Sequence, residues 1–179
     1  MSETVGVYPG TFDPPTVAHV AIAEAAWRQG GLDRLVLAVS NSPLGKKDSG
    51  VSQLDQRVRL LDAVAATRTW LSVAVNDGGL ISDIAAGYDA VVLGSDKWLQ
   101  VTDPGWYGGS GSARDAAVAL LPRVLLAPRH GVVPADLPAG ALVLQLPLEH
   151  GIVSSSGVRD GNIEWLAEDA LDLWTPPIP

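Results

Sequence analysis

Short apolar runs alternate along the chain with longer stretches in which apolar residues recur at every third or fourth position. The runs are typical of strands buried on both faces, and they are Val5–Tyr8, Arg34–Val39, Leu71–Val75, Asp89–Leu93, Val124–Ala127 and Leu142–Leu146. The stretches are typical of helices, and they are Val17–Arg28, Gln53–Ala66, Leu80–Ala86, Ala113–Leu120 and Asn162–Leu173. Because strands alternate with helices, the pattern predicts βαβ units and a parallel, doubly wound sheet.

The predicted α/β fold is Rossmann-like, and it forms a single domain over residues 1–179 because no repeat or linker interrupts the pattern. Loops are expected at 41–50 and at the glycine-rich segment 104–112, and a proline-rich tail at 175–179. In doubly wound sheets, ligands bind beyond the C-terminal strand ends, where the strand order reverses. The loop that follows the first strand, Gly10–Pro15, is therefore the first place to expect a ligand.

Composition and charge narrow the classes of partner. The chain has no cysteine, which excludes disulfides and thiolate metal sites. Its net charge of −8, from 20 acidic and 12 basic residues, disfavours nucleic acid and anionic membranes as partners. No signal peptide or membrane-spanning run is evident, so we expect a cytoplasmic protein that acts on small-molecule substrates, with a homo-oligomer left open.

Two segments far apart in the chain share one arrangement. Gly10–His19 and Val153–Arg159 each follow an apolar run and open a predicted helix. Each places a hydroxyl residue at the predicted helix start and a basic residue three positions later, where a capping box would have Glu or Gln. A basic group there opposes the helix dipole, and a bound anion would relieve that conflict. Two such sites in one small domain predict a polyphosphate ligand.

The first segment has the residues of a phosphate-binding turn. Gly10 permits a close backbone approach, so that N–H groups of the turn can point at a phosphate. Thr16 is the expected N-cap, and His19 can donate to a phosphoryl oxygen as charge builds there. The helix end is expected to lower the pKa of His19 and a bound phosphate to raise it. Taken alone, Thr16 with His19 also fits a plain helix cap beside a surface histidine, and the serines of 154–156 fit an ordinary capping loop.

Together, the two segments resemble the signatures of the nucleotidyltransferase superfamily that carries (His or Thr)-x-Gly-His near the N-terminus. Val153–Arg159 matches the second signature of that superfamily, Ile-Ser-Ser-Thr-x-x-Arg, whereas Ala18 stands where the first signature has glycine. The resemblance implies transfer of an adenylyl group from ATP to a phosphorylated acceptor, with release of pyrophosphate. It also implies Mg²⁺ on the triphosphate and no protein nucleophile or all-protein metal site.

The resemblance also implies roles for individual residues. Those expected to bind the nucleotide are Gly10, Thr11, Phe12, Gly94, Asp96, Ser154, Ser155 and Ser156. Those expected to act on the phosphates are His19, Thr16, Arg159 and Lys46, whereas Lys47 is expected to bind the acceptor. The superfamily's flexible lysine is matched by either Lys46 or Lys47, and the alternative is that both form a solvated pair. Arg57 is either a ligand of the acceptor phosphate or an ordinary helix-surface arginine.

Two further segments resemble nicotinate or nicotinamide mononucleotide adenylyltransferases. Leu93–Trp98 is similar to their Gly-Ala-Asp segment, whose aspartate contacts the nucleotide, which implies that role for Asp96. Asp103–Trp106 is similar to their Pro-x-x-Trp region, which implies that Trp106 stacks on a pyridine ring, the alternative being a loop anchor. The other tryptophans considered, Trp27, Trp70, Trp165 and Trp174, are interpreted as packing residues.

Other functions stay open beside the pyridine-nucleotide enzyme. Val75–Gly79 lacks the aromatic and acidic acceptor loop of those enzymes, so phosphopantetheine, or a small phosphorylated alcohol as in cytidylyltransferases, is an alternative acceptor. Leu93-Gly94 lacks the Arg-Gly pair usual in pantetheine-phosphate adenylyltransferases, which counts against that branch. A nucleotide-binding module without turnover is a second class of function. A dehydrogenase is disfavoured because no Gly-x-Gly-x-x-Gly follows the first strand.

Overall fold

Six parallel strands form one sheet in the computed structural model, which describes residues 2–41 and 54–176. The strand order is β3-β2-β1-β4-β5-β6, and this confirms the predicted α/β, Rossmann-like, doubly wound fold. The strands are β1 (Val5–Gly10), β2 (Arg34–Ser40), β3 (Leu71–Asn76), β4 (Ala90–Gly94), β5 (Arg123–Ala127) and β6 (Leu142–Val143). The order reverses between β1 and β4, so the ends of these two strands face the expected binding crevice.

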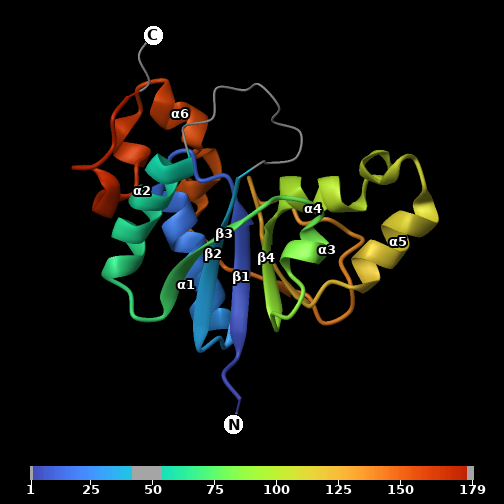
Figure 1. The fold of residues 1–179 in the computed structure, drawn as a ribbon. Coiled ribbons are helices and arrows are strands. Elements are labelled where there is room, and N and C mark those ends of the chain that lie inside the picture. The colour runs from blue at the N-terminus through green and yellow to red at the C-terminus, as the bar shows by residue number, and fades with distance from the viewer. Residues whose placement is uncertain (1, 42–53, 177–179) are drawn as a thin grey trace.

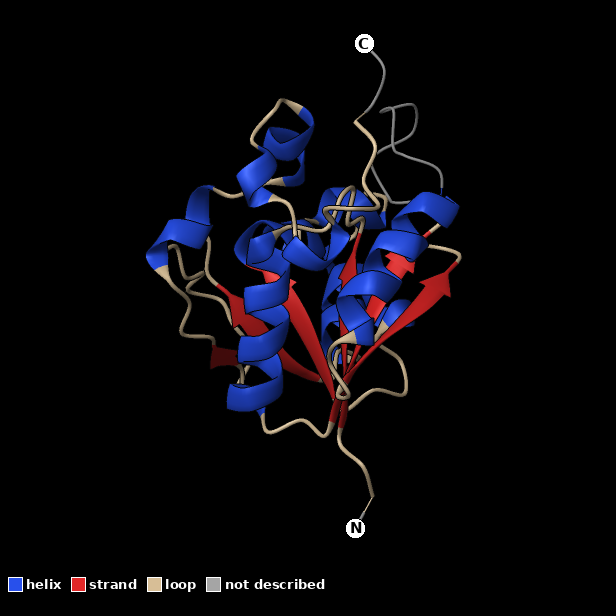
Figure 2. Cartoon of the chain, turned by 90° about the vertical axis from the view of Figure 1, so that its left-hand side faces the viewer, coloured by secondary structure: helices blue, strands red, loops and turns tan. Residues whose placement is uncertain are grey.

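Helices cover both faces of the sheet (Figure 1). On one face α1 (Val17–Gly30) and α2 (Leu54–Ala66) bury the larger apolar cluster, which includes Leu35, Leu61 and Leu125. On the other face lie α3 (Ile81–Ile84), α4 (Ser95–Thr102) and α5 (Gly111–Ala119), packed on a second cluster around the buried Trp98. Figure 2 shows the twisted strands fanning out behind the helices of the first face.

The ends of the elements show why these residues form them. Helix α1 begins at the N-cap Thr16 and ends at Gly31, which takes the left-handed conformation that glycine adopts without steric cost. Within the predicted loop 104–112, residues Pro104–Tyr107 form a 3₁₀ turn, η1, and α5 already starts at Gly111. The sequence pattern does not predict helix α4, because a glycine at position 94 is typical of a strand stop, whereas Gly94 is the N-cap of this helix.

The predicted helix Asn162–Leu173 is wrong. The segment contains two 3₁₀ turns, η3 (Ile163–Trp165) and η4 (Glu168–Ala170), separated by extended backbone. Leu166 forms a bridge with Thr16, and the N–H of Ala167 donates to the Pro15 carbonyl at 3.1 Å. These tertiary contacts take the backbone groups that a continuous helix would need, and they bring the segment onto the loop before α1.

Candidate functional site

Two adjoining cavities lie at the C-terminal ends of the strands. The larger, of about 540 Å³, opens over the ends of β1, β4 and β5. The smaller, of about 250 Å³, lies between the ends of β1 and β2, α3, α4 and η1. Five residues line both cavities, and they are Pro9, Gly10, Thr11, Lys97 and Gln100. The two cavities therefore adjoin at the end of β1.

The turn after β1 is built around the ring of Phe12. This residue is 2 % exposed and has a φ of 48°, in the left-handed region that side chains other than glycine rarely adopt. Its ring packs edge-on against Tyr8 and His19, with centroid distances of 5.4 and 5.0 Å. A Cβ on Gly10 would stand 2.6 Å from the Phe12 ring, so glycine at position 10 lets the ring fold back over the strand end.

His19 closes a capping box at the start of α1. Its backbone N–H donates to Thr16 Oγ1 at 3.3 Å, and its ring Nδ1 accepts from the backbone N–H of Thr16 at 3.0 Å. A nitrogen that accepts from an N–H carries no proton, so the proton of the neutral ring lies on Nε2. The imidazole thus takes the place of the usual Glu or Gln, and the expected clash between a cation and the helix dipole is wrong here.

The second segment also differs from expectation in its register. The N-cap of α6 (Ser155–Arg159) is Ser154, whose Oγ accepts from the Gly157 N–H at 3.1 Å, and not Ser156. Arg159 consequently lies in the last turn, where the helix dipole favours a cation. Neither helix therefore supports the dipole argument for a polyphosphate, and the case for an anion rests on the lining of the cavity.

The two segments touch directly through a clasp, by which we mean the bonds from residues 155–167 to the loop 13–16. The carbonyls of Asp13, Pro14 and Pro15 accept in turn from an Arg159 guanidinium nitrogen, from Ser155 Oγ at 2.7 Å and from the Ala167 N–H. Arg159 also faces the Asp13 carboxylate at 3.6 Å.

Most of the predicted phosphate-binding and nucleotide-binding residues line the larger cavity. They are Gly10, Thr11, Phe12, Thr16, His19, Gly94, Asp96, Ser154, Ser155, Ser156 and Arg159. Ala18, which stands where the signature has glycine, lines it too.

Arg57 is a buried residue of α2, and its interpretation as a helix-surface arginine is wrong. It is 2 % exposed, and its guanidinium donates to the carbonyls of Thr11 at 3.1 Å and Ser40 at 3.0 Å. Burial lowers the pKa of Arg57, and the charge of Asp13 partly raises it again. Arg57 is not among the described residues that line the two cavities, and in this structure it fixes the ends of β1 and β2. Its role toward an acceptor stays a prediction.

The remaining predicted residues occupy separate places. Trp106 of η1 is 39 % exposed and lines the smaller cavity. Asp96 is ion-paired with Arg129 at 2.9 Å at the larger cavity. Lys46 and Lys47 lie outside the described residues. The four tryptophans interpreted as packing residues do pack against the larger apolar cluster, with Trp27 and Trp70 stacked at 4.6 Å.

The cavity residues that sequence reasoning missed include Lys97, Gln100, Tyr107, Arg129 and His150. Lys97 and Gln100 belong to the unexpected helix α4, where Trp98 and Val101 mark the buried side at helical spacing. Tyr107 donates from its hydroxyl to the Val101 carbonyl at 2.9 Å, and burial raises its pKa. Arg129 forms an isolated bridge with Val132 after β5, and His150 lies in a 3₁₀ turn, η2 (Leu148–Ile152). No pattern in the sequence predicts that either residue reaches the cavity.

The described part of the chain has neither a clustered metal site nor a membrane-spanning helix. In residues 2–41 and 54–176, no group of three His, Asp or Glu side chains is placed to hold a metal ion. No helix in the same ranges has the length and apolarity needed to cross a bilayer.

Comparisons with known proteins found a matching family model and several similar proteins. The model of the family described as cytidylyltransferase-like matches residues 7–130. Over 61 residues the chain is 41% identical to a probable nicotinate-nucleotide adenylyltransferase of Listeria monocytogenes serotype 4a (strain HCC23), covering 34% of this chain and 32% of that protein. Over 92 residues it is 32% identical to a phosphopantetheine adenylyltransferase of Helicobacter pylori (strain J99), covering 51% of this chain and 54% of that protein. The matches thus span about a third to a half of these relatives.

Proposed function

The chain belongs to the cytidylyltransferase-like family of nucleotidyltransferases, and from that premise we propose that it transfers an adenylyl group from ATP to a phosphorylated acceptor. The observation that carries the proposal is the pair of cavities that adjoin at Gly10 and Thr11. The larger cavity has room and donors for a nucleoside triphosphate. The smaller one would hold the acceptor with its phosphate turned toward that junction.

The reaction is a direct displacement at phosphorus. An oxygen of the acceptor phosphate attacks the α-phosphorus and forms a new P–O bond. The bond from the α-phosphorus to the bridging oxygen breaks, and its electron pair leaves with pyrophosphate. The attacking oxygen is already an anion, so no general base is required, and the protein contributes by positioning groups and stabilising charge.

The described residues supply donors for each phosphate. His19 Nε2–H would donate to an α-phosphate oxygen, because Nδ1 is bonded to the Thr16 backbone. Arg159 and the serines at the start of α6 would hold the β- and γ-phosphates. Mg²⁺ would arrive on the phosphate oxygens with part of its water shell and would offset their negative charge.

The lining of the smaller cavity favours an acceptor with a flat ring. Trp106 and Tyr107 stand there beside Ile81, Ile84 and Val101, which form an apolar, aromatic wall. A pyridine ring stacked on Trp106 would gain both apolar burial and ring-on-ring contact. We therefore propose nicotinate or nicotinamide mononucleotide as the acceptor. Phosphopantetheine is the second candidate, favoured by the longer match to the Helicobacter pylori relative.

A pyrophosphate-release assay tests the proposal. Purified protein with Mg²⁺ is given ATP or CTP, each with nicotinate mononucleotide, nicotinamide mononucleotide, phosphopantetheine or glycerol 3-phosphate. We expect turnover with ATP and a pyridine mononucleotide, with the dinucleotide product identified by mass spectrometry. Tight ATP binding without turnover on any acceptor would instead indicate a nucleotide-binding module.

A variant of Trp106 tests the acceptor assignment. Trp106→Ala should raise the KM for the mononucleotide about tenfold, because a ring stacked on an aromatic side chain gains about 1–3 kcal/mol. The KM for ATP should stay the same, since Trp106 lines only the smaller of the two cavities. Leu120→Ala, at a residue 73% exposed after α5, is the matched control and should change neither constant. An unchanged acceptor KM in Trp106→Ala would indicate that this tryptophan only anchors its loop.

A further inference from the structure

We infer that Lys97 binds the phosphate of the acceptor and holds it against the α-phosphate of the triphosphate. The inference rests on the proposed function, and it assigns to α4 a role that the sequence motifs gave to Arg57 or to the loop lysines. Lys97 lies directly after Asp96 on the first turn of α4, the helix that begins where β4 ends (Figure 1). Neither signature segment, Gly10–His19 or Val153–Arg159, includes Lys97.

The position of Lys97 is the first argument. It is one of the five residues that line both cavities, and the other four bear no charge. Nucleotidyl transfer requires the acceptor phosphate and the α-phosphate to meet, and the boundary between the cavities is where a mononucleotide and a triphosphate would meet. A cation at that boundary can contact an oxygen of each reacting group.

Charge is the second argument. Of the described residues that line the smaller cavity, Lys97 is the only one with a charged side chain. Two phosphates repel each other strongly at contact distance in a partly desolvated cleft. The net charge of −8 makes the surrounding field unfavourable to both, so a local cation is needed to bring them together.

The placement of the side chain is the third argument. Lys97 Nζ donates to Gln100 Oε1 at 2.6 Å, and Gln100 lines the same two cavities one turn later in α4. This bond places the ammonium group beside the amide of Gln100, at the boundary of the two cavities. Arg57, by contrast, donates to the carbonyls of Thr11 and Ser40 and is not among the described residues that line either cavity.

The arrangement also fits the shape of a mononucleotide. Trp106 and Lys97 line the same cavity, one on η1 and the other at the boundary with the larger cavity. A ring stacked on Trp106 and a phosphate bound by Lys97 would place the ribose between them. The neutral nucleoside should therefore reach Trp106 without using Lys97, and this difference makes the inference testable.

The experiment measures the binding of nicotinate mononucleotide and of nicotinate riboside by titration calorimetry. Wild type, Lys97→Met and Lys97→Arg are compared. We expect Lys97→Met to weaken mononucleotide binding about 10- to 100-fold, the range for loss of a charge-assisted hydrogen bond. Riboside binding should be unchanged, and Lys97→Arg should recover most of the affinity.

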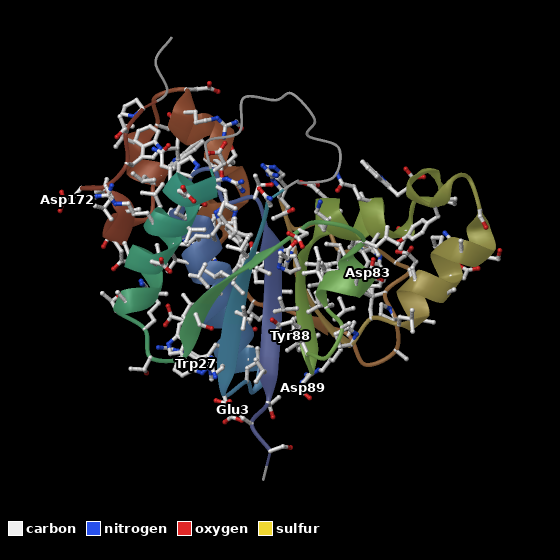
Figure 3. All side chains as sticks on the ribbon, viewed as in Figure 1. Glu3, Trp27, Asp83, Tyr88, Asp89 and Asp172 are labelled. Carbon is white, nitrogen blue, oxygen red and sulfur yellow. The ribbon has the colours of Figure 1, made fainter. Side chains whose placement is uncertain are left out.

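The matched control removes a positive charge at the opposite end of the sheet. Arg34→Met breaks the exposed pair of Arg34 with Glu3 at 3.5 Å, and Glu3 lies at the N-terminal ends of the strands (Figure 3). It should leave both affinities as in wild type. Thermal melting checks the fold of each variant, and Gln100→Leu is the second variant should Lys97→Met not fold. Loss of its bond to Lys97 should weaken mononucleotide binding several-fold and leave the riboside unaffected.

Three results would overturn the inference, and the third, which also overturns the proposed function, is distinguishable from the first two. If wild type turns over a mononucleotide and folded Lys97→Met binds it equally well, Lys97 has no such role and the proposed function stands. Equal losses for mononucleotide and riboside would have the same meaning, because the phosphate would not be the group recognised. If wild type neither binds nor converts any mononucleotide, the proposed function fails and the role of Lys97 fails with it.

Discussion

The ring Nδ1 of His19 lies 3.0 Å from the backbone nitrogen of Thr16 and accepts its hydrogen bond. One side chain thereby finishes the helix cap of α1 and also lines the larger cavity. Protonation of Nδ1 would break the bond to Thr16, so the cap and the neutral ring support each other. The tautomer is therefore set by the local fold before any ligand binds.

Two variants of His19 should separate its role in stability from its role in catalysis. His19→Ala removes the cap acceptor and should lower the free energy of unfolding by about 1 kcal/mol. His19→Glu restores a capping-box acceptor and should fold at least as stably as wild type. Both should lower kcat about 100- to 1000-fold, because neither can donate to the α-phosphate.

Urea denaturation and steady-state kinetics together check this prediction. The affinity of His19→Ala for ATP should fall far less than its kcat, since the proposed bond strengthens as charge develops in the transition state. Equal losses in rate and ATP affinity would mean that His19 only binds the ground state. Loss of stability in His19→Glu would contradict the capping role.

Gly10→Ala should destabilise the fold by about 1–3 kcal/mol, the cost of forcing extra volume into a packed region. The new methyl group would stand 2.6 Å from the ring of Phe12, which is held between Tyr8 and His19. Gly111→Ala is the matched control, because a methyl group added to that glycine would meet no atom within 4 Å and the residue begins a helix. It should be neutral or stabilising. Equal unfolding midpoints for the two variants would show that the Phe12 ring moves away from the new methyl group without a measurable loss of stability.

Ser155→Ala tests the clasp. It removes the donor to the Pro14 carbonyl, and we expect a loss of about 1 kcal/mol in the free energy of unfolding together with a raised KM for ATP. Ser112→Ala, which removes an exposed hydroxyl at the start of α5, should change neither quantity. If Ser155→Ala matches Ser112→Ala in both measurements, the remaining two bonds of the clasp are sufficient to maintain the stability of the fold and the KM for ATP.

Tyr8 should make stability fall at high pH. Burial raises the pKa of this phenol above its ordinary value near 10, so the folded state keeps the proton when the unfolded chain loses it. Stability is therefore fully present below about pH 10 and declines above it, at up to about 1.4 kcal/mol per pH unit for one proton. Urea unfolding at pH 8, 10 and 11 should show a flatter decline in Tyr8→Phe than in wild type. Parallel declines would contradict the assignment to Tyr8.

The sequence predicted the sheet well because its strands follow from local composition. Residues such as Val91 and Leu125 are fully buried and apolar, and their short runs have no competing interpretation as helices. The N-cap of α1 and the stop at Gly31 were also readable, since Thr16 and glycine act within one turn of the chain. The convergence of His19 and Arg159 on one cavity followed from the motifs taken together.

Failures arose where distant contacts decide the conformation. Residues 162–173 have helical spacing, yet Leu166 and Ala167 bond to Thr16 and Pro15 about 150 positions earlier. Arg57 has the sequence context of a surface residue, but its partners Thr11 and Ser40 lie on other elements. The register of Ser154 and the cavity position of Lys97 likewise depend on packing that no local pattern encodes.

The clasp has a consequence for synthesis on the ribosome. Asp13, Pro14 and Pro15 emerge early, whereas their partners Ser155, Arg159 and Ala167 emerge about 140 residues later. At about 5–20 residues per second, the nascent loop waits roughly 7–30 seconds for these bonds. Competence to bind nucleotide should therefore appear late in translation, after the strands of the sheet have already emerged.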